Sequence, residues 1–206
     1  INNPKGTVIV FHGNAGTAAY RAYYVRALES LGYRVLLAEY PGYGGRAGEL
    51  GEKSFVNDAK ETVQLIEQQF KDPIFLLGES LGSGVAAAVV KNMPGRISGI
   101  VLITPWDSLL SVAQSKFSRW FPVRLFMKDK YDTIGNLRNY GKRVAVIGAQ
   151  DDEIIPISHA NALYKSLSGT KEMWVIEGAG HNDWLSKIDL WWWQTVMEFI
   201  SGKSYT

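Results

Sequence analysis

The stretch Pro73-Ile-Phe-Leu-Leu-Gly-Glu-Ser-Leu-Gly-Ser-Gly84 decides the fold of this 206-residue chain. Its apolar first half predicts a buried strand, and the small apolar residues that follow it predict a helix. Between the two, Ser80 stands in a G-x-S-x-G pattern, which in this context forms a sharp strand-to-helix turn with the serine at its tip. Gly78 and Gly82 fit because larger side chains would collide with the strand or the helix. Ser80 is therefore a candidate nucleophile in a strained backbone conformation.

Strand-like and helical segments alternate on both sides of this stretch. Short apolar runs predict strands at 7–11, 34–38, 74–77, 99–103, 144–147 and 172–176. Helical patterns lie near 17–31, 53–70, 81–92, 158–168 and 183–201. Such alternation predicts an α/β fold, with a mostly parallel sheet of about six strands and helices on both faces. In such sheets functional groups gather at the C-terminal ends of the strands.

One irregular stretch, 105–141, is too long for a simple connection. We expect it to form a short helical cap over the sheet edge, inserted into a single domain that spans 1–206. Aromatic and basic side chains mix at 111–130, which favours a cap that lines the pocket. Contact with an anionic membrane surface is the alternative, and Pro122 weakens it by interrupting any long helix.

The composition excludes several classes of function. With a net charge of +2, nothing in the sequence points to nucleic acid as a partner. The absence of cysteine rules out disulfides, thiol catalysis and thiolate metal sites. No histidine pair has metal-ligand spacing, so we expect neither a metal nor a cofactor. No apolar run reaches the roughly 20 residues of a membrane span. A cytoplasmic location is favoured unless an anchor or signal precedes Ile1.

A serine nucleophile needs a base, and the chain has three histidines, His12, His159 and His181. His181 follows the last predicted strand in a glycine-rich loop and is free to reach Ser80, so it is the preferred base. His12 follows the first predicted strand, within the loop assigned below to the oxyanion hole. His159 is near the start of a helical pattern and is expected to be exposed.

The base in turn needs an orienting acid. Asp152 follows the predicted strand 144–147 and is preferred over its neighbour Asp151. Asp107 also follows a strand, but it is better explained as a helix N-cap or a turn former. The order serine, aspartate, histidine is the one expected for a triad built on such a turn.

Two backbone amides are candidates for the oxyanion hole. Leu81 begins a helix, where unpaired N–H groups favour negative charge. Asn14, in Phe11-His-Gly-Asn-Ala-Gly16, would supply the second donor. Candidate substrate-binding side chains are His12, Tyr43, Trp106 and Trp184. Glu79 should point away from the attacking side of the serine, and the sequence suggests no partner for it.

The last predicted helix is rich in tryptophan. A core stripe of Ile188, Trp191, Trp192, Val196 and Phe199 fits the helical period. Trp193 falls off this stripe and is expected to be exposed.

Together these motifs resemble the α/β-hydrolase superfamily, and within it the Bem46-like and prolyl-oligopeptidase-like serine hydrolases. The matching pieces are Phe11-His-Gly-Asn-Ala-Gly16, Tyr40-Pro-Gly-Tyr-Gly44, Gly78-Glu-Ser-Leu-Gly-Ser-Gly84, Asp152-Glu-Ile-Ile-Pro156 and Gly178-Ala-Gly-His-Asn-Asp183. The resemblance implies that Ser80 is the nucleophile, His181 the base and Asp152 the acid. It also implies that the sequence starts at the family's third strand.

The expected reaction is cleavage of a small-molecule ester, thioester or lipid acyl bond through an acyl-enzyme on Ser80. One alternative keeps the triad and changes the bond, giving a small aminopeptidase- or oligopeptidase-like hydrolase. Another, of a different class, is a non-catalytic binding module. The sequence does not predict an oligomeric state.

Overall fold

The computed structural model describes residues 2–116 and 128–202. Within them, six strands form one sheet in the order β2-β1-β3-β4-β5-β6, and every neighbouring pair is parallel. The strands are β1 (Thr7–Phe11), β2 (Arg34–Ala38), β3 (Ile74–Glu79), β4 (Ile97–Ile103), β5 (Arg143–Ala149) and β6 (Lys171–Ile176). The predicted α/β architecture with a parallel sheet is confirmed. Strands β1 and β2 have their predicted bounds, and each of β3 to β6 is one to three residues longer than predicted.

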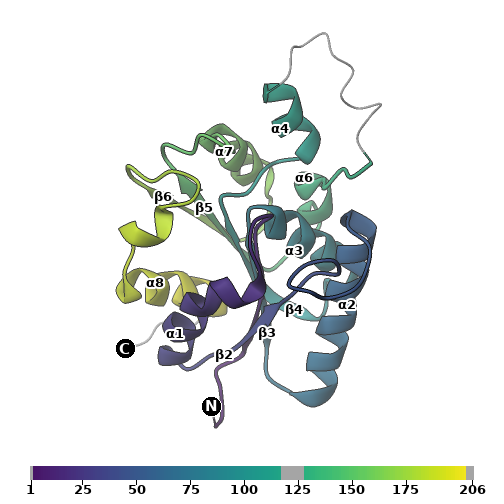
Figure 1. The fold of residues 1–206 in the computed structure, drawn as a ribbon. Coiled ribbons are helices and arrows are strands. Elements are labelled where there is room, and N and C mark those ends of the chain that lie inside the picture. Colours follow the sequence, from purple (N-terminus) through teal and green to yellow (C-terminus); the bar gives the residue numbers. More distant parts are fainter. Residues whose placement is uncertain (1, 117–127, 203–206) are drawn as a thin grey trace.

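Helices cover both faces of the sheet (Figure 1). The α-helices are α1 (Ala22–Ser30), α2 (Glu52–Gln69), α3 (Leu81–Asn92), α4 (Leu109–Lys116), α6 (Thr133–Leu137), α7 (Ile157–Ser166) and α8 (Leu190–Ser201). The described residues also contain two short 3-10 helices, η1 (Ala18–Arg21) and η2 (Trp184–Lys187). Helices α1 and α8 lie together on one face, and α2 and α3 pack together on the other (Figure 1).

The core divides into two layers because successive strand residues point to opposite faces. In β1, Ile9 and Phe11 join the layer under α2 and α3, whereas Val8 and Val10 join the layer under α1 and α8. The central strands are buried on both sides, which explains their continuous apolar runs. Because all the strand pairs are parallel, the carboxyl ends of the six strands lie at one edge.

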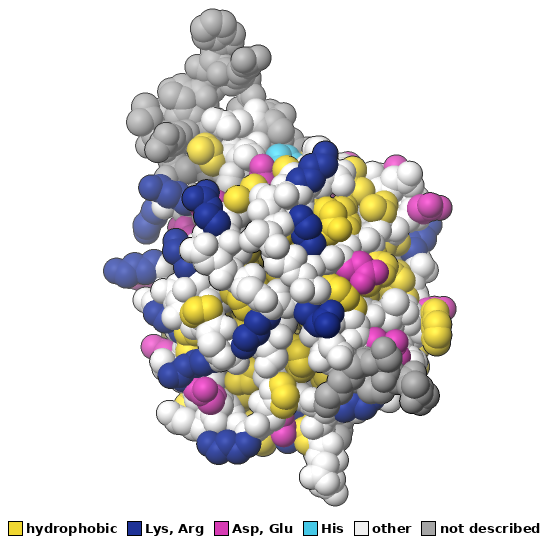
Figure 2. All heavy atoms as spheres, turned by 180° about the vertical axis from the view of Figure 1, so that it is seen from behind, with side chains coloured by type: hydrophobic (Ala, Val, Ile, Leu, Met, Phe, Trp, Pro, Cys, Tyr) yellow, Lys and Arg dark blue, Asp and Glu magenta, His cyan; other side chains and the backbone are white. Residues whose placement is uncertain are grey.

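Part of the predicted cap, 105–141, is described as α4 and α6. The predictions for residues 117–127, including the membrane-contact alternative, lie outside the described residues. None of the helices within 2–116 and 128–202 is both long and apolar enough to span a membrane. On the face in Figure 2, lysine and arginine side chains are dispersed among acidic and apolar ones.

In the tryptophan-rich helix, the burial predicted for Val196 is confirmed, and Ile188, Trp192 and Phe199 pack partly buried against the core, but the predictions for Trp191 and Trp193 are wrong. Trp191 is 70% exposed, whereas Trp193 is only 3% exposed. The buried stripe consists of Trp193, Val196, Met197 and Ile200. The helix begins only at Leu190, where Asp189 caps it by accepting a hydrogen bond from the Trp192 backbone N–H at 2.8 Å. This start separates α8 from η2 and leaves Ile188 outside the helix.

Candidate active site

Ser80 occupies the turn between β3 and α3 with φ of 53° and ψ of −113°, a conformation that is strained for a residue with a side chain. The glycines around it are needed for close packing. A Cβ on Gly82 would collide with the carbonyl of Phe11, and one on Gly78 would collide with the backbone of Gly82. The Ser80 backbone N–H donates to Ile103 O at 2.9 Å, which ties the turn to β4.

Three side chains from separate loops form a hydrogen-bonded chain. His181 Nε2 lies 3.0 Å from Ser80 Oγ, and His181 Nδ1 lies 2.7 Å from Asp152 Oδ2. Because an ionised carboxylate only accepts, the geometry assigns a proton to Nδ1 and leaves Nε2 to accept from the serine hydroxyl. The other Asp152 oxygen accepts from the backbone N–H groups of Ile154 and Ile155, at 2.9 and 2.7 Å. These bonds orient the carboxylate toward the imidazole.

The alternative acids and bases lie elsewhere. Asp151 is exposed, and its backbone N–H donates to Ala179 O at 2.8 Å. His159 is 8% exposed, so the prediction of an exposed residue is wrong, and its Nδ1 lies 2.9 Å from Asp107 Oδ1. Asp107 Oδ1 also accepts from the Ser108 backbone N–H at 2.7 Å, which is neither the bond of an N-cap nor that of an Asx turn.

The loop after β1 passes directly beside the nucleophile. A Cβ on Gly13 would lie 3.5 Å from Ser80 Cβ, so the loop and the nucleophile turn are nearly in contact at this point. Tyr43 Oη donates to Asn14 Oδ1 at 2.7 Å. Within the described residues the Asn14 backbone N–H donates no hydrogen bond. Leu81 is the first residue of α3, so its N–H has no acceptor one helical turn earlier within the helix.

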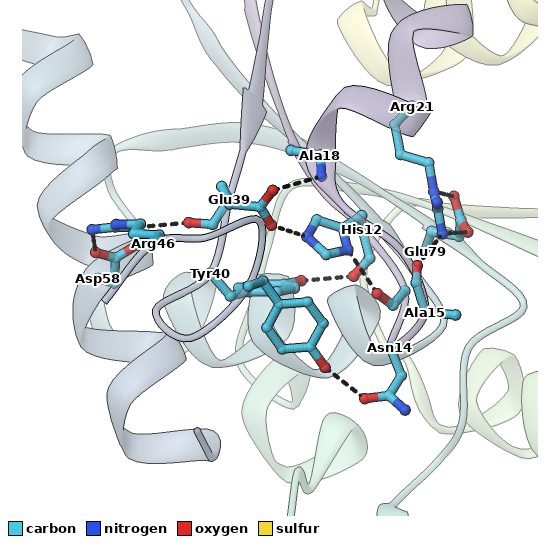
Figure 3. A network of polar contacts seen from close by, with 12 residues as sticks. His12, Asn14, Ala15, Ala18, Arg21, Glu39, Tyr40, Arg46, Asp58 and Glu79 are labelled. Atoms are coloured by element: carbon cyan, nitrogen blue, oxygen red, sulfur yellow. Dashed lines mark hydrogen bonds and ion pairs between the residues drawn. The ribbon is translucent and has the colours of Figure 1, made fainter. Parts of the chain in front are cut away.

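His12 is the first residue of this loop, and its side chain is 1% exposed. Its Nδ1 donates to Gly13 O at 2.7 Å, and its Nε2 lies 2.9 Å from Glu39 Oε1 (Figure 3). The second Glu39 oxygen accepts from the Ala18 backbone N–H at 3.0 Å. Both ring nitrogens of His12, which is predicted to bind substrate, thus contact protein groups that stabilise the loop.

Two cavities flank the serine and the histidine. One, of about 470 Å³, is lined by Ser80 and by side chains that include Tyr43 and Trp106, both predicted as pocket residues. Most of its wall is apolar, and it also carries Asp129. The other, of about 410 Å³, is lined by His181 and Trp184 among others. Among the described residues, no group of three His, Asp or Glu side chains is placed to hold a metal ion.

Sequence reasoning missed the surroundings of Glu79. Its carboxylate accepts hydrogen bonds from Arg21, Tyr23 and Tyr24. Burial, reinforced by the Glu79 charge, raises the pKa of both tyrosines well above that of a free phenol, so they remain protonated donors. These partners lie 55 to 58 positions away in the sequence, and no local spacing signals the contact.

The fold recurs in solved enzymes of low sequence identity. The Pyrococcus furiosus esterase Pf2001 superposes with a TM-score of 0.79 at 22% identity, over 98% of this chain and 82% of that one. The Paleococcus ferrophilus monoacylglycerol lipase has a TM-score of 0.72 at 18% identity, over 98% and 96%. At these identities the similarity concerns the fold.

Curated relatives are longer than this chain. An uncharacterized protein of Mycobacterium tuberculosis is 35% identical over 179 residues, which is 85% of this chain and 63% of the relative. The lysophosphatidylserine lipase ABHD12 of Danio rerio is 28% identical over 192 residues, 82% of this chain and 50% of the relative. The chain therefore spans between half and two thirds of the length of these relatives.

The family model described as "Serine aminopeptidase, S33" matches residues 2–132. The matched span includes the nucleophile turn and the loop after β1, and the loops carrying Asp152 and His181 follow it. With the parallel sheet and the turn at Ser80, the match assigns the family: the chain belongs to the S33 serine aminopeptidase family of α/β hydrolases.

Proposed function

We propose that this hydrolase cleaves a carboxylic ester, thioester or lipid acyl bond through an acyl-enzyme on Ser80. The observation that carries the proposal is the hydrogen-bonded chain Ser80–His181–Asp152, with distances of 3.0 and 2.7 Å. A positioned base is what converts a serine hydroxyl into a nucleophile, and an orienting acid keeps the base in the useful tautomer.

In the first half of the reaction, Ser80 Oγ bonds to the substrate carbonyl carbon while its proton passes to His181 Nε2. The carbonyl oxygen becomes negative and accepts hydrogen bonds from the Leu81 and Asn14 backbone N–H groups. Each donor of this kind contributes roughly 3–4 kcal/mol to transition-state stabilisation. The bond to the leaving group then breaks, and His181 gives its proton to that group. In the second half, water attacks the carbonyl carbon of the acyl-enzyme while its proton passes to His181 Nε2. The bond to Ser80 Oγ then breaks, His181 returns the proton to that oxygen, and the carboxylic acid is released.

The cavity beside Ser80 supports an apolar acyl group. Its volume of about 470 Å³ is in the range of small-molecule sites, and its wall includes Leu81, Leu109, Val112 and Ile155. A sequence relative named lysophosphatidylserine lipase favours the same class of substrate. So do two structural neighbours, which are named esterase and monoacylglycerol lipase.

A second candidate is an aminopeptidase, as the family description says of its members. One observation favours it here: Asp129 lies on the wall of the cavity beside Ser80, where a carboxylate could bind a substrate ammonium group. The mostly apolar wall ranks this reading below ester hydrolysis.

The test compares p-nitrophenyl esters of increasing chain length with an amino-acid p-nitroanilide. We expect turnover of the esters, and a roughly 10⁶-fold loss of kcat in Ser80→Ala, because removal of a serine nucleophile costs about that much. Ser30→Ala, which removes an exposed serine hydroxyl on α1, is the matched control and should leave kcat unchanged.

Labelling by a fluorophosphonate probe supplies an independent readout. Wild type should be labelled and Ser80→Ala should not. Well-folded wild-type protein that resists labelling would indicate a binding module instead, and Ser80-dependent cleavage of the anilide alone would select the aminopeptidase.

A further inference from the structure

The carboxylate of Glu79, the residue before the nucleophile, is held by four hydrogen bonds. Arg21 donates from Nε to Oε2 at 3.3 Å and from Nη2 to Oε1 at 3.0 Å. Tyr23 and Tyr24 donate their hydroxyl protons to Oε2 at 3.0 and 2.9 Å. The side chains of Arg21 and Glu79 are only 15% and 13% exposed. Such a well-satisfied, charge-assisted pair is rigid.

The same guanidinium also contacts the loop after β1. Arg21 Nη2 donates to Ala15 O at 3.2 Å, one residue beyond Asn14 (Figure 3). The pair packs against Gly13 as well, because a Cβ there would lie 3.4 Å from Glu79 Oε1 and 3.6 Å from Arg21 Nη2. One ion pair therefore touches both the nucleophile turn and the loop.

These two segments supply the two proposed oxyanion donors. Leu81 begins α3, and Asn14 belongs to the loop after β1, so no single element sets the distance between their N–H groups. Oxyanion donors act only within about 2.7–3.1 Å of the oxygen. A misplacement of about 1 Å can cost roughly 100-fold in rate.

We propose that Arg21 and Glu79 are positioning residues that keep the two halves of the oxyanion hole in register. This inference rests on the proposed serine-hydrolase function and adds two residues to its machinery, neither of which touches the reacting atoms. Arg21 joins the segments, and Glu79 fixes the guanidinium against the nucleophile turn.

The charges of the pair support this role. Burial lowers the pKa of Arg21, but the charge and hydrogen bonds of Glu79 outweigh burial, and the pKa is raised on balance. The guanidinium thus stays charged and neutralises Glu79 next to a site where negative charge develops. Removing Arg21 alone would leave a partly buried carboxylate with its two tyrosine donors but no counter-charge, which is costlier than removing both partners.

The experiment measures kcat and KM for p-nitrophenyl butyrate and for its thiono ester, in which sulfur replaces the carbonyl oxygen. Sulfur is the weaker hydrogen-bond acceptor, so the oxo-to-thiono rate ratio reports on the oxyanion hole. For Glu79→Ala and Arg21→Met we expect kcat for the oxo ester to fall about 10- to 100-fold with KM nearly unchanged. The oxo-to-thiono ratio should fall with it.

Further variants separate positioning from general stability. Glu79→Gln should recover part of kcat, and Arg21→Met/Glu79→Gln should be more active than Arg21→Met. The matched control is Arg34→Met, which removes the Arg34–Asp72 pair, of 24% and 22% side-chain exposure, at the opposite ends of the strands. It should lower the melting temperature but leave kcat and the ratio unchanged.

Two outcomes would overturn the inference without touching the proposed function. One is Ser80-dependent turnover that survives Glu79→Ala with an unaltered oxo-to-thiono ratio. The other is an equal fall of the oxo-ester and thiono-ester rates, which leaves their ratio unaltered and indicates a general loss of stability. If Glu79→Ala does not fold, the size-conserving Glu79→Gln and Arg21→Lys decide, and an unaltered ratio in both contradicts the positioning role. Wild type without Ser80-dependent turnover would contradict the proposed function itself.

Discussion

Two histidine–aspartate pairs lie at the same edge of the sheet, and within the described residues only one has a serine hydroxyl hydrogen-bonded to its imidazole. In both, imidazole Nδ1 faces a carboxylate oxygen, at 2.7 Å for His181–Asp152 and 2.9 Å for His159–Asp107. His181 Nε2 meets Ser80 Oγ, whereas within the described residues His159 Nε2 has no hydrogen-bond partner. A histidine–aspartate pair alone therefore only joins two segments. Whether it can act in catalysis depends on the group that faces imidazole Nε2.

The second pair joins elements rather than reactants. His159 lies on α7, and Asp107 lies between β4 and α4, where its backbone carbonyl also accepts from the Ile134 N–H at 3.1 Å. It therefore fastens the base of α4 and α6 to α7. We expect its loss to affect stability and the first pair's loss to affect catalysis.

Of the substitutions that compare the two pairs, Asp152→Asn should lower kcat the most. The amide cannot hold the Nδ1–H tautomer as the carboxylate does, so kcat should fall by roughly 10⁴-fold, the cost seen when a triad acid is replaced in this way. Steady-state kinetics with a p-nitrophenyl ester measures the effect. A loss of less than tenfold in a folded variant would indicate another acid, with Asp151 the first to test.

Single substitutions should separate the two histidines. His181→Gln removes the imidazole that faces Ser80 Oγ, so kcat for a p-nitrophenyl ester should fall to about the level of Asp152→Asn. His159→Gln removes an imidazole that joins elements, so its kcat should stay within about tenfold of wild type. Equal losses in the two folded variants, measured by steady-state kinetics, would contradict the assignment of His181 as base.

The smallest effect on activity should come from Asp107→Asn. It weakens a charge-assisted hydrogen bond to His159, and such bonds contribute about 1.5–3 kcal/mol. Urea denaturation should show a loss of that order in the free energy of unfolding, while kcat stays within about threefold of wild type. A drop in kcat comparable to that of Asp152→Asn would show that the second pair also serves the reaction.

Much of the architecture could be predicted because it depends on local chemistry. The strand at 7–11 and the helix at 81–92 have the predicted bounds, since an apolar period and a glycine-framed turn are read within a few residues. Steric clash predicts glycine at positions 78 and 82, and the structure identifies the backbone groups that a Cβ would meet there. Such steric limits act between neighbouring residues and do not depend on how distant parts of the chain pack.

The errors concern side chains whose surroundings come from far away in the sequence. Trp191 and Trp193 both stand in a helix that begins with four consecutive apolar residues, so periodicity allows more than one buried stripe. The partners Tyr24 and Trp184 select Trp193, with ring centroids 5.5 and 6.3 Å away. The burial of His159 likewise depends on Asp107, 52 positions earlier.

The sequence by itself determined the parallel α/β fold, the strained turn at Ser80 and the order in which serine, aspartate and histidine follow one another. These depend on backbone sterics, hydrophobic period and the geometry of parallel strands. Only the tertiary structure decided which histidine meets the serine, which tryptophan is buried, and that Arg21 connects Glu79 to the loop after β1. The physical reason is that hydrogen bonds and packing between distant residues depend on how whole elements dock.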